Sequence, residues 1–475
     1  MNENAIGVIG LGTMGCNLLL NISDHGYPVS GYDIDPNKAA ALTAIRTDKV
    51  FATSDLQAFV SSLAAPAKII LLVPAGKIVD NVLQQLTPLL TAGDIIVDGG
   101  NSYFKDTERR FQELKKLDLH FMGVGISGGE EGARKGPSIM PGGDPEAYNS
   151  ISTILNAIAA KYNNISCAAY MGNGPAGHYV KMVHNGIEYA IMQLIAESYH
   201  LLKRINHLDN PEIAKIFEGW SNNDLNGYLM ESTSEVLHRM DDITHIGWLV
   251  DKVLDVARAK GTGKWASQDA MDLQVPVPVI DQAVIARDLS SWIDIRIVLS
   301  KHINEHHEEA ILEIDLIQQA LFAAFMLAYI QGLHLIHEAS KQYGFQTQMI
   351  EVVRNWRSGC IIRSTMLPIF EKAYSRNPEQ SNLLLDPEIF EMINSRISAL
   401  TNVVISGIRG GEAIPCFQSS LSYFQMFTSA QLPMNIIQAL RDHFGAHTFE
   451  RRDTPGIFHA DWAEKGTTTA IPEKK

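Results

Sequence analysis

Near its start the chain reads Ala5-Ile-Gly-Val-Ile9, followed at once by Gly10-Leu-Gly12-Thr13-Met14-Gly15 and then by Asn17-Leu-Leu-Leu-Asn-Ile22. The first run is short, apolar and rich in β-branched residues, which is typical of a buried strand. The last run has the apolar spacing of a helix. The glycines between them suit a tight turn, so the stretch predicts the first strand-turn-helix unit of a doubly wound α/β domain.

The glycines of this turn predict a dinucleotide-binding site. Gly10 permits the turn, Gly12 lets the backbone approach a pyrophosphate, and Gly15 lets the helix pack closely on the strand. The helix N-terminus then faces the anion. The same spacing also occurs in a plain strand-to-helix turn. Here, however, a second strand at 28–32 ends on Asp33, close to the expected offset of about 20 residues.

Asp33 indicates which dinucleotide binds. A carboxylate at this position accepts hydrogen bonds from the ribose hydroxyls, whereas a 2′-phosphate would bring like charges together at a cost of roughly 1–4 kcal/mol. Neither Ile34 nor Asp35 offers a cation. The local chemistry therefore favours NAD. In the alternative, Asp33 points to solvent and Lys38 supplies the missing positive charge.

Two further strands are predicted before short loops. The run 68–73 precedes a Pro-Ala-Gly turn, and 94–98 precedes Gly99-Gly-Asn101-Ser102. Strands that alternate with helices imply a parallel sheet. From local sequence, Asn101 or Ser102 is expected to cap the next helix. A ligand contact of Asn101 is the alternative.

A glycine-rich stretch, Gly123-Val-Gly-Ile-Ser127-Gly128-Gly129-Glu-Glu-Gly132, predicts an anion-binding loop. Such a loop exposes backbone N–H groups, and Ser127 adds a hydroxyl. A flexible, solvated loop is the alternative, but the apolar residues on both sides argue against it.

The stretch Lys181-Met-Val-His184-Asn185-Gly-Ile-Glu188 begins a long apolar helical pattern. At about 100° per residue, its four numbered side chains fall on one stripe, so a cation, an imidazole, an amide and a carboxylate converge. The flanking residues are apolar, and charged groups on a buried helix are costly unless paired or functional. The stripe therefore predicts catalytic residues. A buried lysine–glutamate pair that only closes a core is the alternative.

The composition restricts the class of protein. A chain of 475 residues should form two or three domains. Its net charge of −14 argues against a general nucleic-acid or membrane surface, so an anionic substrate would need a local basic pocket. The four cysteines lack CxxC spacing, which fits a reducing cytosol and indicates neither disulfides nor zinc. No signal-peptide pattern is visible before the first strand.

Helical periodicity dominates from about residue 176 onward, where strands are hard to find. The longest apolar run, 320–330, is shorter than the ~18 residues of a membrane span and is interpreted as a buried helix. A polar stretch at 301–309 has histidines at i, i+4 spacing. We interpret it as solvated surface rather than a metal site, because it lacks apolar support. No metal is expected.

The chain resembles the 6-phosphogluconate dehydrogenases, the decarboxylating enzymes of the pentose phosphate pathway. The likeness runs nearly end to end and is carried by residues 126–134, 136–143, 181–189, 260–265, 359–363 and 441–447. It implies one large all-helical domain after the Rossmann-like domain, and a C-terminal tail that reaches the neighbouring subunit of a homodimer. The expected domains are 1–175, 176–430 and 431–475, in a cytoplasmic enzyme.

The resemblance also assigns roles to residues. The substrate, 6-phosphogluconate, is expected to contact Asn101, Ser127, Gly128, Gly129, His184, Asn185, Tyr189, Lys260, Thr262, Arg287, Arg441 and His447. The cofactor is expected to contact Gly10, Gly12, Thr13, Met14, Gly15, Asp33, Val73, Ala75 and Asn101. Without the resemblance, Arg287 would be interpreted as the partner of Asp288 or another carboxylate.

Lys181 and Glu188 are the expected catalytic pair. Lys181, if desolvation lowers its pKa, takes the proton of the C3 hydroxyl while hydride passes to the nicotinamide. Carbon dioxide then leaves, and protonated Glu188 delivers a proton to C1 to give ribulose 5-phosphate. Two alternatives are a non-decarboxylating β-hydroxyacid dehydrogenase and a non-catalytic dinucleotide-sensing scaffold. The first should lack the long helical half, and the second should lack Lys181 or Glu188.

The chain departs from the family at the second strand. Most relatives carry Asn-Arg-Thr there, with the arginine pairing the 2′-phosphate of NADP, whereas this chain has Asp33-Ile34-Asp35. It also has Gly12 where many relatives have alanine and Pro74 where many have lysine. NAD is therefore expected to be preferred, although NADP is the usual cofactor of the family.

Overall fold

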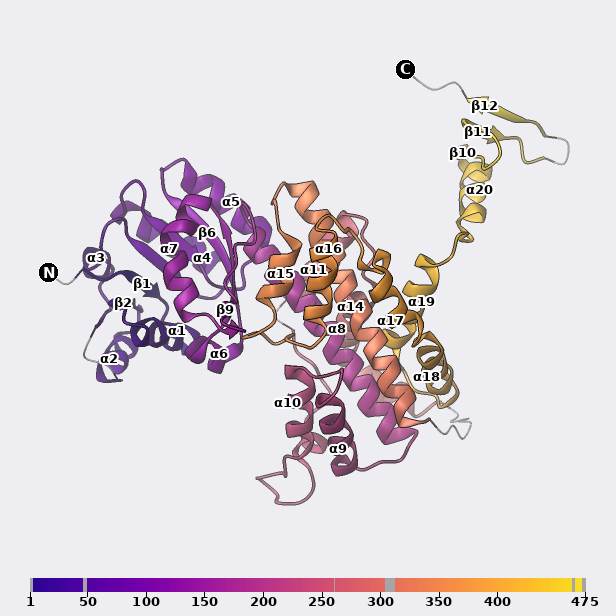
Figure 1. Cartoon of the computed structure of the whole chain (residues 1–475), viewed down its shortest axis with the longest axis horizontal. Coiled ribbons are helices and arrows are strands. Elements are labelled where there is room, and N and C mark those ends of the chain that lie inside the picture. The colour runs from indigo at the N-terminus through magenta and orange to yellow at the C-terminus, as the bar shows by residue number, and fades with distance from the viewer. Residues whose placement is uncertain (1–2, 46–48, 260, 304–311, 464–465, 472–475) are drawn as a thin grey trace. The chain divides into compact units, whose positions relative to one another are not determined.

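The computed structural model describes residues 3–45, 49–259, 261–303, 312–463 and 466–471 (Figure 1). The chain forms two compact units, Met1–Leu421 and Ser422–Lys475. The first unit contains an α/β domain and a large helical region, and the second is small. The expected fold, a Rossmann-like domain followed by a large helical part, is confirmed.

The α/β domain contains a seven-stranded sheet of order β3-β2-β1-β4-β5-β6-β7. Its strands are β1 (Ile6–Ile9), β2 (Val29–Tyr32), β3 (Val50–Thr53), β4 (Lys68–Leu71), β5 (Ile95–Asp98), β6 (His120–Ser127) and β7 (Ser138–Gly143). The first six in sequence pair in parallel, and β7 pairs with β6 in antiparallel orientation. The expected parallel sheet is therefore present, and β7, which the sequence did not predict, adds an antiparallel strand at its edge through a hairpin with β6.

Helices cover both faces of this sheet. They are α1 (Thr13–Asp24), α2 (Pro36–Ile45), α3 (Leu56–Ser61), α4 (Lys77–Leu86), α5 (Phe104–Lys115), α6 (Gly129–Lys135) and α7 (Pro145–Ile158). Apolar residues of α1, α2 and α7 form one core cluster with the sheet, and those of α3, α4 and α5 form another. Two cores on opposite faces are the arrangement of a doubly wound fold.

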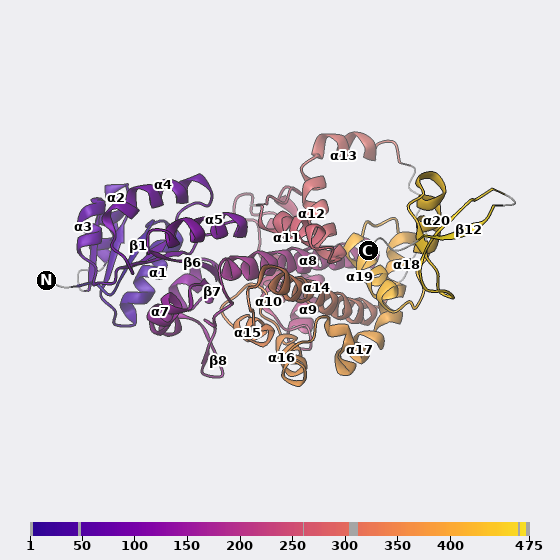
Figure 2. The same ribbon diagram turned by 90° about the horizontal axis from the view of Figure 1, so that it is seen from above.

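The helical region is built around two long helices that pack against each other, α8 (Ala176–Arg204) and α14 (Ile314–Tyr343) (Figure 2). The others are α9 (Asn210–Ser221), α10 (Tyr228–Leu237), α11 (Thr262–Asp272), α12 (Pro278–Ser290), α13 (Ile293–Ser300), α15 (Met349–Asn355), α16 (Leu367–Arg376), α17 (Pro387–Asn394), α18 (Ile397–Arg409) and α19 (Pro415–Phe427). Gly332 of α14 permits the close approach, since a Cβ there would lie 2.5 Å from Ile187 of α8.

The prediction of a buried helix at 320–330 is confirmed, because every residue of that run is buried within α14. Within the described ranges, α14 is the helix whose length and composition would allow it to cross a membrane. However, 94% of its apolar window is covered by the rest of the protein. It is therefore the central core helix of the helical region.

The β6/β7 hairpin lies directly against the first turns of α8. A Cβ on Gly125 of β6 would overlap the Cβ of Lys181, and a Cβ on Gly142 of β7 would overlap the backbone of Gly177. The two strands and the helix can be this close only because these positions have no side chain. The α/β domain and the helix that carries Lys181 are thus joined backbone to backbone.

The C-terminal unit contains α20 (Met434–Gly445) and a three-stranded antiparallel sheet of β10 (Phe449–Glu450), β11 (Ile457–Ala460) and β12 (Thr468–Ile471). The sequence did not predict these strands. They are two to four residues long, which is too short for a clear alternating pattern.

Candidate active site

The polar stripe predicted on α8 is present. Lys181, His184 and Asn185 are buried, and the Glu188 side chain is 22% exposed. His184 Nδ1 lies 3.9 Å from Glu188 Oε2 and 3.1 Å from Asn185 Oδ1. Four polar side chains therefore share one face of a helix whose other faces are packed in the core.

Burial shifts the pKa of both charged members of the stripe. It lowers the pKa of Lys181, and the Glu188 carboxylate opposes that shift. It raises the pKa of Glu188, and the cations of Lys181 and Arg287 oppose that shift. Burial and the neighbouring Lys181 also hold the pKa of His184 well below its ordinary value. Burial therefore shifts the amine, the carboxyl and the imidazole each toward its uncharged form.

Ser127 ends β6 beside this stripe, with Ser127 Oγ 3.3 Å from His184 Nε2. The glycine-rich stretch around it is not the loop that the sequence predicts. Residues 123–127 belong to β6, because they pair with β7, and 129–135 form α6. Only Gly128 separates the two elements. It has a φ of 116°, and a Cβ there would lie 2.6 Å from the carbonyl oxygen of Gly359.

Thr262 of α11 and Arg287 of α12 approach the polar side of α8, on which Tyr189 also lies. Asn185 Nδ2 donates a hydrogen bond to Thr262 Oγ1 at 3.1 Å, which links α8 to the start of α11. The guanidinium carbon of Arg287 lies 3.4 Å from the centre of the Tyr189 ring, a cation–π contact. Among the described residues, no ion pair joins Arg287 to Asp288, and the charge of Arg287 acts instead on the carboxyl of Glu188. Lys260 lies outside the described residues.

The glycine turn has the geometry expected of a dinucleotide site. Gly10 has a φ of 96°, and a Cβ there would lie 2.5 Å from the carbonyl oxygen of Leu72. A Cβ on Gly15 would overlap the carbonyl oxygen of Gly10, so this glycine is required for packing. Gly12 has nothing within 4 Å of the corresponding position. Gly12, Thr13 and the partly buried Met14 are at the accessible N-terminus of α1, where an anion can approach.

Asp33 points into the turn, so the alternative in which it faces solvent is wrong. It is 6% exposed, and Oδ2 accepts hydrogen bonds from the backbone N–H of Leu11 at 2.8 Å and from Lys38 Nζ at 3.1 Å. Burial acts to raise the pKa of Asp33, but hydrogen bonds from the N–H groups of Asp35 and Leu11 and from Lys38 hold it below its ordinary value. Asp33 is thus an ionised residue that stabilises the glycine turn by accepting the hydrogen bond from Leu11.

Val73 and Ala75 follow β4, and Asn101 follows β5, at neighbouring carboxyl ends of the sheet. Asn101 is exposed. The prediction that Asn101 or Ser102 caps the next helix is wrong, since α5 has Tyr103 at its N-cap and no side-chain cap. Ser102 instead donates a hydrogen bond to Asp98 Oδ2 at 2.6 Å. Asn101 is therefore left accessible for ligand contact.

Arg441 and His447 are exposed residues of the C-terminal unit, at the end of α20 and just beyond it. The neighbouring Asp442 is fully buried. It accepts hydrogen bonds from the N–H groups of Thr448 at 2.8 Å and Ala460 at 3.1 Å. His459 Nδ1 lies 2.9 Å from its Oδ1, and Trp462 Nε1 donates to its Oδ2 at 2.9 Å. One carboxylate thus ties α20 to the segment carrying His447 and to β11.

Sequence reasoning missed a buried polar cluster formed by Asp98, Arg110 and His178. His178 extends the α8 stripe one turn before Lys181, so its spacing was a usable signal. Arg110 gave no such signal, because an arginine in a helix is usually at the surface.

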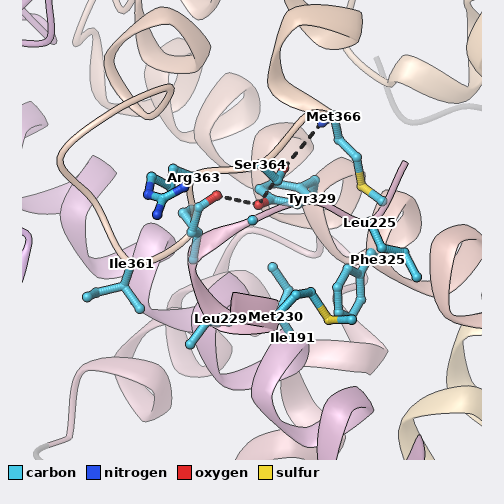
Figure 3. A pocket seen from close by; sticks show the side chains of 12 residues that line it. Ile191, Leu225, Leu229, Met230, Phe325, Tyr329, Ile361, Arg363, Ser364 and Met366 are labelled. Carbon is cyan, nitrogen blue, oxygen red and sulfur yellow. Dashed lines mark hydrogen bonds between the residues drawn. The ribbon is translucent and has the colours of Figure 1, made fainter. Parts of the chain in front are cut away.

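The cavity drawn in Figure 3 is not lined by the candidate active-site residues described above. It lies among α8, α10, α14 and the segment 361–366, and its open volume of about 10 Å³ is that of a single water molecule. Most of its walls are apolar. Tyr329 Oη donates a hydrogen bond to the carbonyl oxygen of Ile362, and it lies 3.2 Å from Ser364 Oγ. We interpret this cavity as a packing feature beside the loop that supports Gly128.

Among the described ranges, no group of three or more His, Cys, Asp or Glu side chains has the arrangement of a metal site. The stretch 304–309, with its histidines, lies outside the described residues. The four cysteines are free.

The comparisons with known proteins cover almost the whole chain. The family profile described as NAD binding domain of 6-phosphogluconate dehydrogenase matches residues 5–172, and that of the 6-phosphogluconate dehydrogenase C-terminal domain matches 177–462. The chain is 44% identical to the NADP(+)-dependent, decarboxylating 6-phosphogluconate dehydrogenase of Bacillus subtilis, over 97% of this chain and 100% of that protein. It is 45% identical to the decarboxylating enzyme of Lactococcus lactis subsp. cremoris, over 97% and 99% of the two chains.

A solved structure agrees. The chain is similar to the 6-phosphogluconate dehydrogenase of Plasmodium falciparum, solved in its apo form and in complexes with NADP+ and with 6-phosphogluconate. The TM-score is 0.93 at 37% identity, covering 96% of this chain and 100% of that one. The identity, coverage and matched fold lead to one conclusion: this chain belongs to the 6-phosphogluconate dehydrogenase family.

Proposed function

We propose that this chain catalyses the oxidative decarboxylation of 6-phosphogluconate to ribulose 5-phosphate and carbon dioxide, with hydride transfer to a nicotinamide dinucleotide. The observation that carries the proposal is the buried pair Lys181 and Glu188 on one face of α8, whose pKa values burial shifts in opposite directions. A base that is neutral and an acid that is protonated are what the reaction requires.

The residues of the α/β domain fit a dinucleotide. Gly12 leaves open space at the N-terminus of α1, where Thr13 and Met14 follow, and Gly10 and Gly15 hold the turn. Val73, Ala75 and Asn101 are at the adjacent strand ends and would contact the same ligand. The bound dinucleotide supplies the hydride acceptor, and the protein supplies its position.

Lys181 acts first as a base and then as a cation. As a neutral amine it takes the proton from the C3 hydroxyl, and in protonated form it stabilises the enolate that remains when the carboxyl group leaves as carbon dioxide. Glu188 delivers a proton to C1. Ser127, Gly128, Gly129, His184, Asn185 and Thr262 orient the substrate.

The substrate phosphate and carboxylate need cations in a protein of net charge −14. We assign this role to Lys260, Arg287, Arg441 and His447, with Tyr189 supporting Arg287 through their ring contact. Lys181 is buried and Arg287 is only partly buried, which fits a site with a desolvated reacting end and a more accessible phosphate end.

We propose that NAD is preferred over NADP. The proposal is supported by the ionised Asp33 in the turn and by the apolar Ile34, which is 82% exposed where most relatives carry an arginine. The Bacillus subtilis relative is named NADP(+)-dependent, so this chain would differ from it. Lys38 pairs with Asp33 and so does not present a free cation to a 2′-phosphate.

We further propose a cytoplasmic homodimer with domains at 1–175, 176–430 and 431–475, in which the last supplies Arg441 and His447 to the neighbouring subunit. The proposal of a dimer is supported by large apolar side chains that are exposed in the single chain. In the first unit they include Leu289, Trp292 and Leu299, and on α20 they include Leu440 and Phe444, which is 73% exposed. In each unit, apolar side chains left exposed in this way would be covered by a partner subunit.

The deciding experiment incubates the enzyme with 6-phosphogluconate and NAD or NADP, follows reduced cofactor by absorbance, and traps carbon dioxide. Equal yields of both products support the proposal. Reduced cofactor without carbon dioxide would indicate the β-hydroxyacid dehydrogenase alternative. Dinucleotide binding without turnover would indicate a non-catalytic scaffold.

A further inference from the structure

Arg110 of α5 is a buried arginine whose guanidinium faces three separate groups. Its side chain has no exposed surface. Nη2 donates a hydrogen bond to the carbonyl oxygen of Gly76 at 3.0 Å, Nε donates to Asp80 Oδ1 at 2.7 Å, and Nη1 lies 3.6 Å from Asp98 Oδ2. A buried arginine is costly unless its charge is paired, and here two nitrogens donate hydrogen bonds while Nη1, which has no hydrogen-bond partner in the part of the chain that the structure describes, is held by its ion pair with Asp98.

The first two contacts hold the loop after β4. Gly76 closes the segment that contains Val73 and Ala75, and Asp80 lies in the first turn of α4, which the segment enters. By binding the carbonyl oxygen of Gly76 and the Asp80 carboxylate together, Arg110 fixes where this loop ends and where α4 begins.

The third contact holds the loop after β5. Asp98 is the last residue of β5, and its carboxylate accepts hydrogen bonds from the Gly100 N–H at 3.0 Å and from the Ser102 hydroxyl at 2.6 Å. These bonds enclose Asn101 on both sides. The Asp98 carboxylate is itself buried beside Arg110, so the charge of Arg110 stabilises the group that shapes the Asn101 loop.

The same cluster reaches the catalytic helix. Thr107 lies one turn before Arg110 on α5, and its Oγ1 is 2.7 Å from Nδ1 of the buried His178. Burial lowers the pKa of His178, and Asp98 opposes that shift. His178 is one turn before Lys181 on α8. The buried cluster therefore connects two ligand loops to the helix that carries the base.

We propose that Arg110 is a positioning residue that holds the 73–76 and 98–102 loops in register, and that it thereby sets the affinity for both dinucleotide and substrate. The inference rests on the proposed function, because Val73, Ala75 and Asn101 are ligand contacts only within it. Arg110 touches neither ligand. Its loss should therefore weaken binding much more than it slows the chemistry of Lys181 and Glu188.

The test compares Arg110→Lys with Arg109→Lys. Arg109 is the preceding residue and also donates to Asp80 Oδ1, at 2.9 Å, but its other partner is Glu113 and it is exposed. A lysine at 110 keeps the positive charge. Its single ammonium group cannot replace the planar guanidinium, whose separate nitrogens face three groups. Both variants keep a cation near Asp80. A difference in Kd or KM between them therefore reflects the loss of the Arg110 contacts to the two loops.

We expect Arg110→Lys to raise the dinucleotide Kd, measured by protein fluorescence without turnover, and both KM values by about tenfold or more. Its kcat at saturation should stay within about threefold, and Arg109→Lys should match the parent enzyme. Ser102→Ala, which removes only one hydroxyl, should raise KM for both ligands by a smaller factor.

Three results would overturn the inference: equal Kd and KM values in the two lysine variants, a loss confined to kcat, or a lowered Tm with unchanged binding. If Arg110→Lys does not fold, the Ser102→Ala variant tests the inference instead. Unchanged KM values in Ser102→Ala would then overturn the inference. An inactive parent enzyme that still binds dinucleotide would contradict the proposed function, while the Kd comparison would continue to test the role of Arg110.

Discussion

Lys181 and Glu188 lie two turns apart on the same face of α8, and burial moves their pKa values toward each other, lowering that of the amine and raising that of the carboxyl. Each group is thereby shifted toward its uncharged form, which is the minor form of both in water at neutral pH. The first two predictions follow from this relationship.

Lys181→Met should abolish turnover while leaving dinucleotide binding intact. Methionine has a similar length but no amine, and the glycine turn belongs to a different domain. We expect kcat to fall by roughly 10³-fold or more, with an unchanged Kd for the dinucleotide. Lys203→Met is the matched control, because Lys203 is on the same helix and pairs with Asp251. Turnover of Lys181→Met close to that of Lys203→Met would refute the base assignment.

Glu188→Gln should move the acid limb of the kcat/KM profile to lower pH. The Glu188 carboxylate raises the pKa of Lys181, so its removal lowers that pKa further. Lys181 must be neutral to act as a base, and activity is lost as pH falls and the amine becomes protonated. A lower pKa therefore extends activity to more acidic conditions, although the maximal rate should fall. A limb that stays in place or moves to higher pH would show that Glu188 does not influence Lys181.

The parent enzyme should use NAD with a kcat/KM at least about tenfold above that for NADP, because ionised Asp33 repels a 2′-phosphate. Asp33→Asn combined with Ile34→Arg should reverse the preference. Lys38→Met serves as a control, since it removes the ion pair with Asp33 without adding a phosphate ligand. If the parent prefers NADP and Lys38→Met abolishes that preference, Lys38 holds the phosphate and our assignment of Asp33 is wrong.

Two inactive variants should restore each other if subunits share sites. In a dimer of Lys181→Met with Arg441→Ala, one of the two sites contains a normal Lys181 and a normal Arg441 from different chains. Random reassociation of equal amounts should recover about one quarter of the parent sites. Activity would be assayed before and after co-refolding, with each variant refolded alone as the control. No recovery, despite heterodimers seen by mass spectrometry, would place Arg441 in its own subunit's site.

Asp442→Asn should loosen the C-terminal unit and remove a pH dependence. Burial acts to raise the pKa of Asp442, but hydrogen bonds from His459, Ala460, Trp462 and Thr448 hold it well below its ordinary value. A lowered carboxyl pKa contributes stability that is present above its unfolded value and lost as pH falls toward the folded one. Hydrogen exchange at 447–462, relative to its intrinsic rate, should therefore quicken in the parent only below about pH 4, the ordinary pKa of an aspartate carboxyl. In Asp442→Asn it should be fast at neutral pH as well, and Asp461→Asn, an exposed neighbour, should behave like the parent.

Several of these features could be predicted from residues alone. Helical spacing was sufficient to place Lys181, His184 and Glu188 on one face, because a regular helix converts sequence separation directly into direction. The glycine turn could be predicted for a similar reason, since its spacing is local. In both cases the geometry depends on a few consecutive residues.

Other features depended on partners far away in the sequence. Gly123 to Ser127 resemble a loop until β7 pairs with them, and Ser102 resembles a helix cap until the Asp98 carboxylate is placed beside it. Arg110 is buried because Gly76, Asp80 and Asp98 converge on it, which no local pattern shows. The strands after α20 depend on pairing across turns in the same way.

The direct backbone contact between the β6/β7 hairpin and α8 has a consequence for heat tolerance. Side-chain packing softens on warming as rotamers are explored, and a distance set by such packing drifts. The spacing from the sheet to Lys181 is set instead by main-chain atoms at Gly125, Gly142 and Gly177. The distance between the sheet of the α/β domain and the Lys181 amine should therefore remain nearly constant until the whole unit unfolds. Activity and folded structure should then be lost at the same temperature.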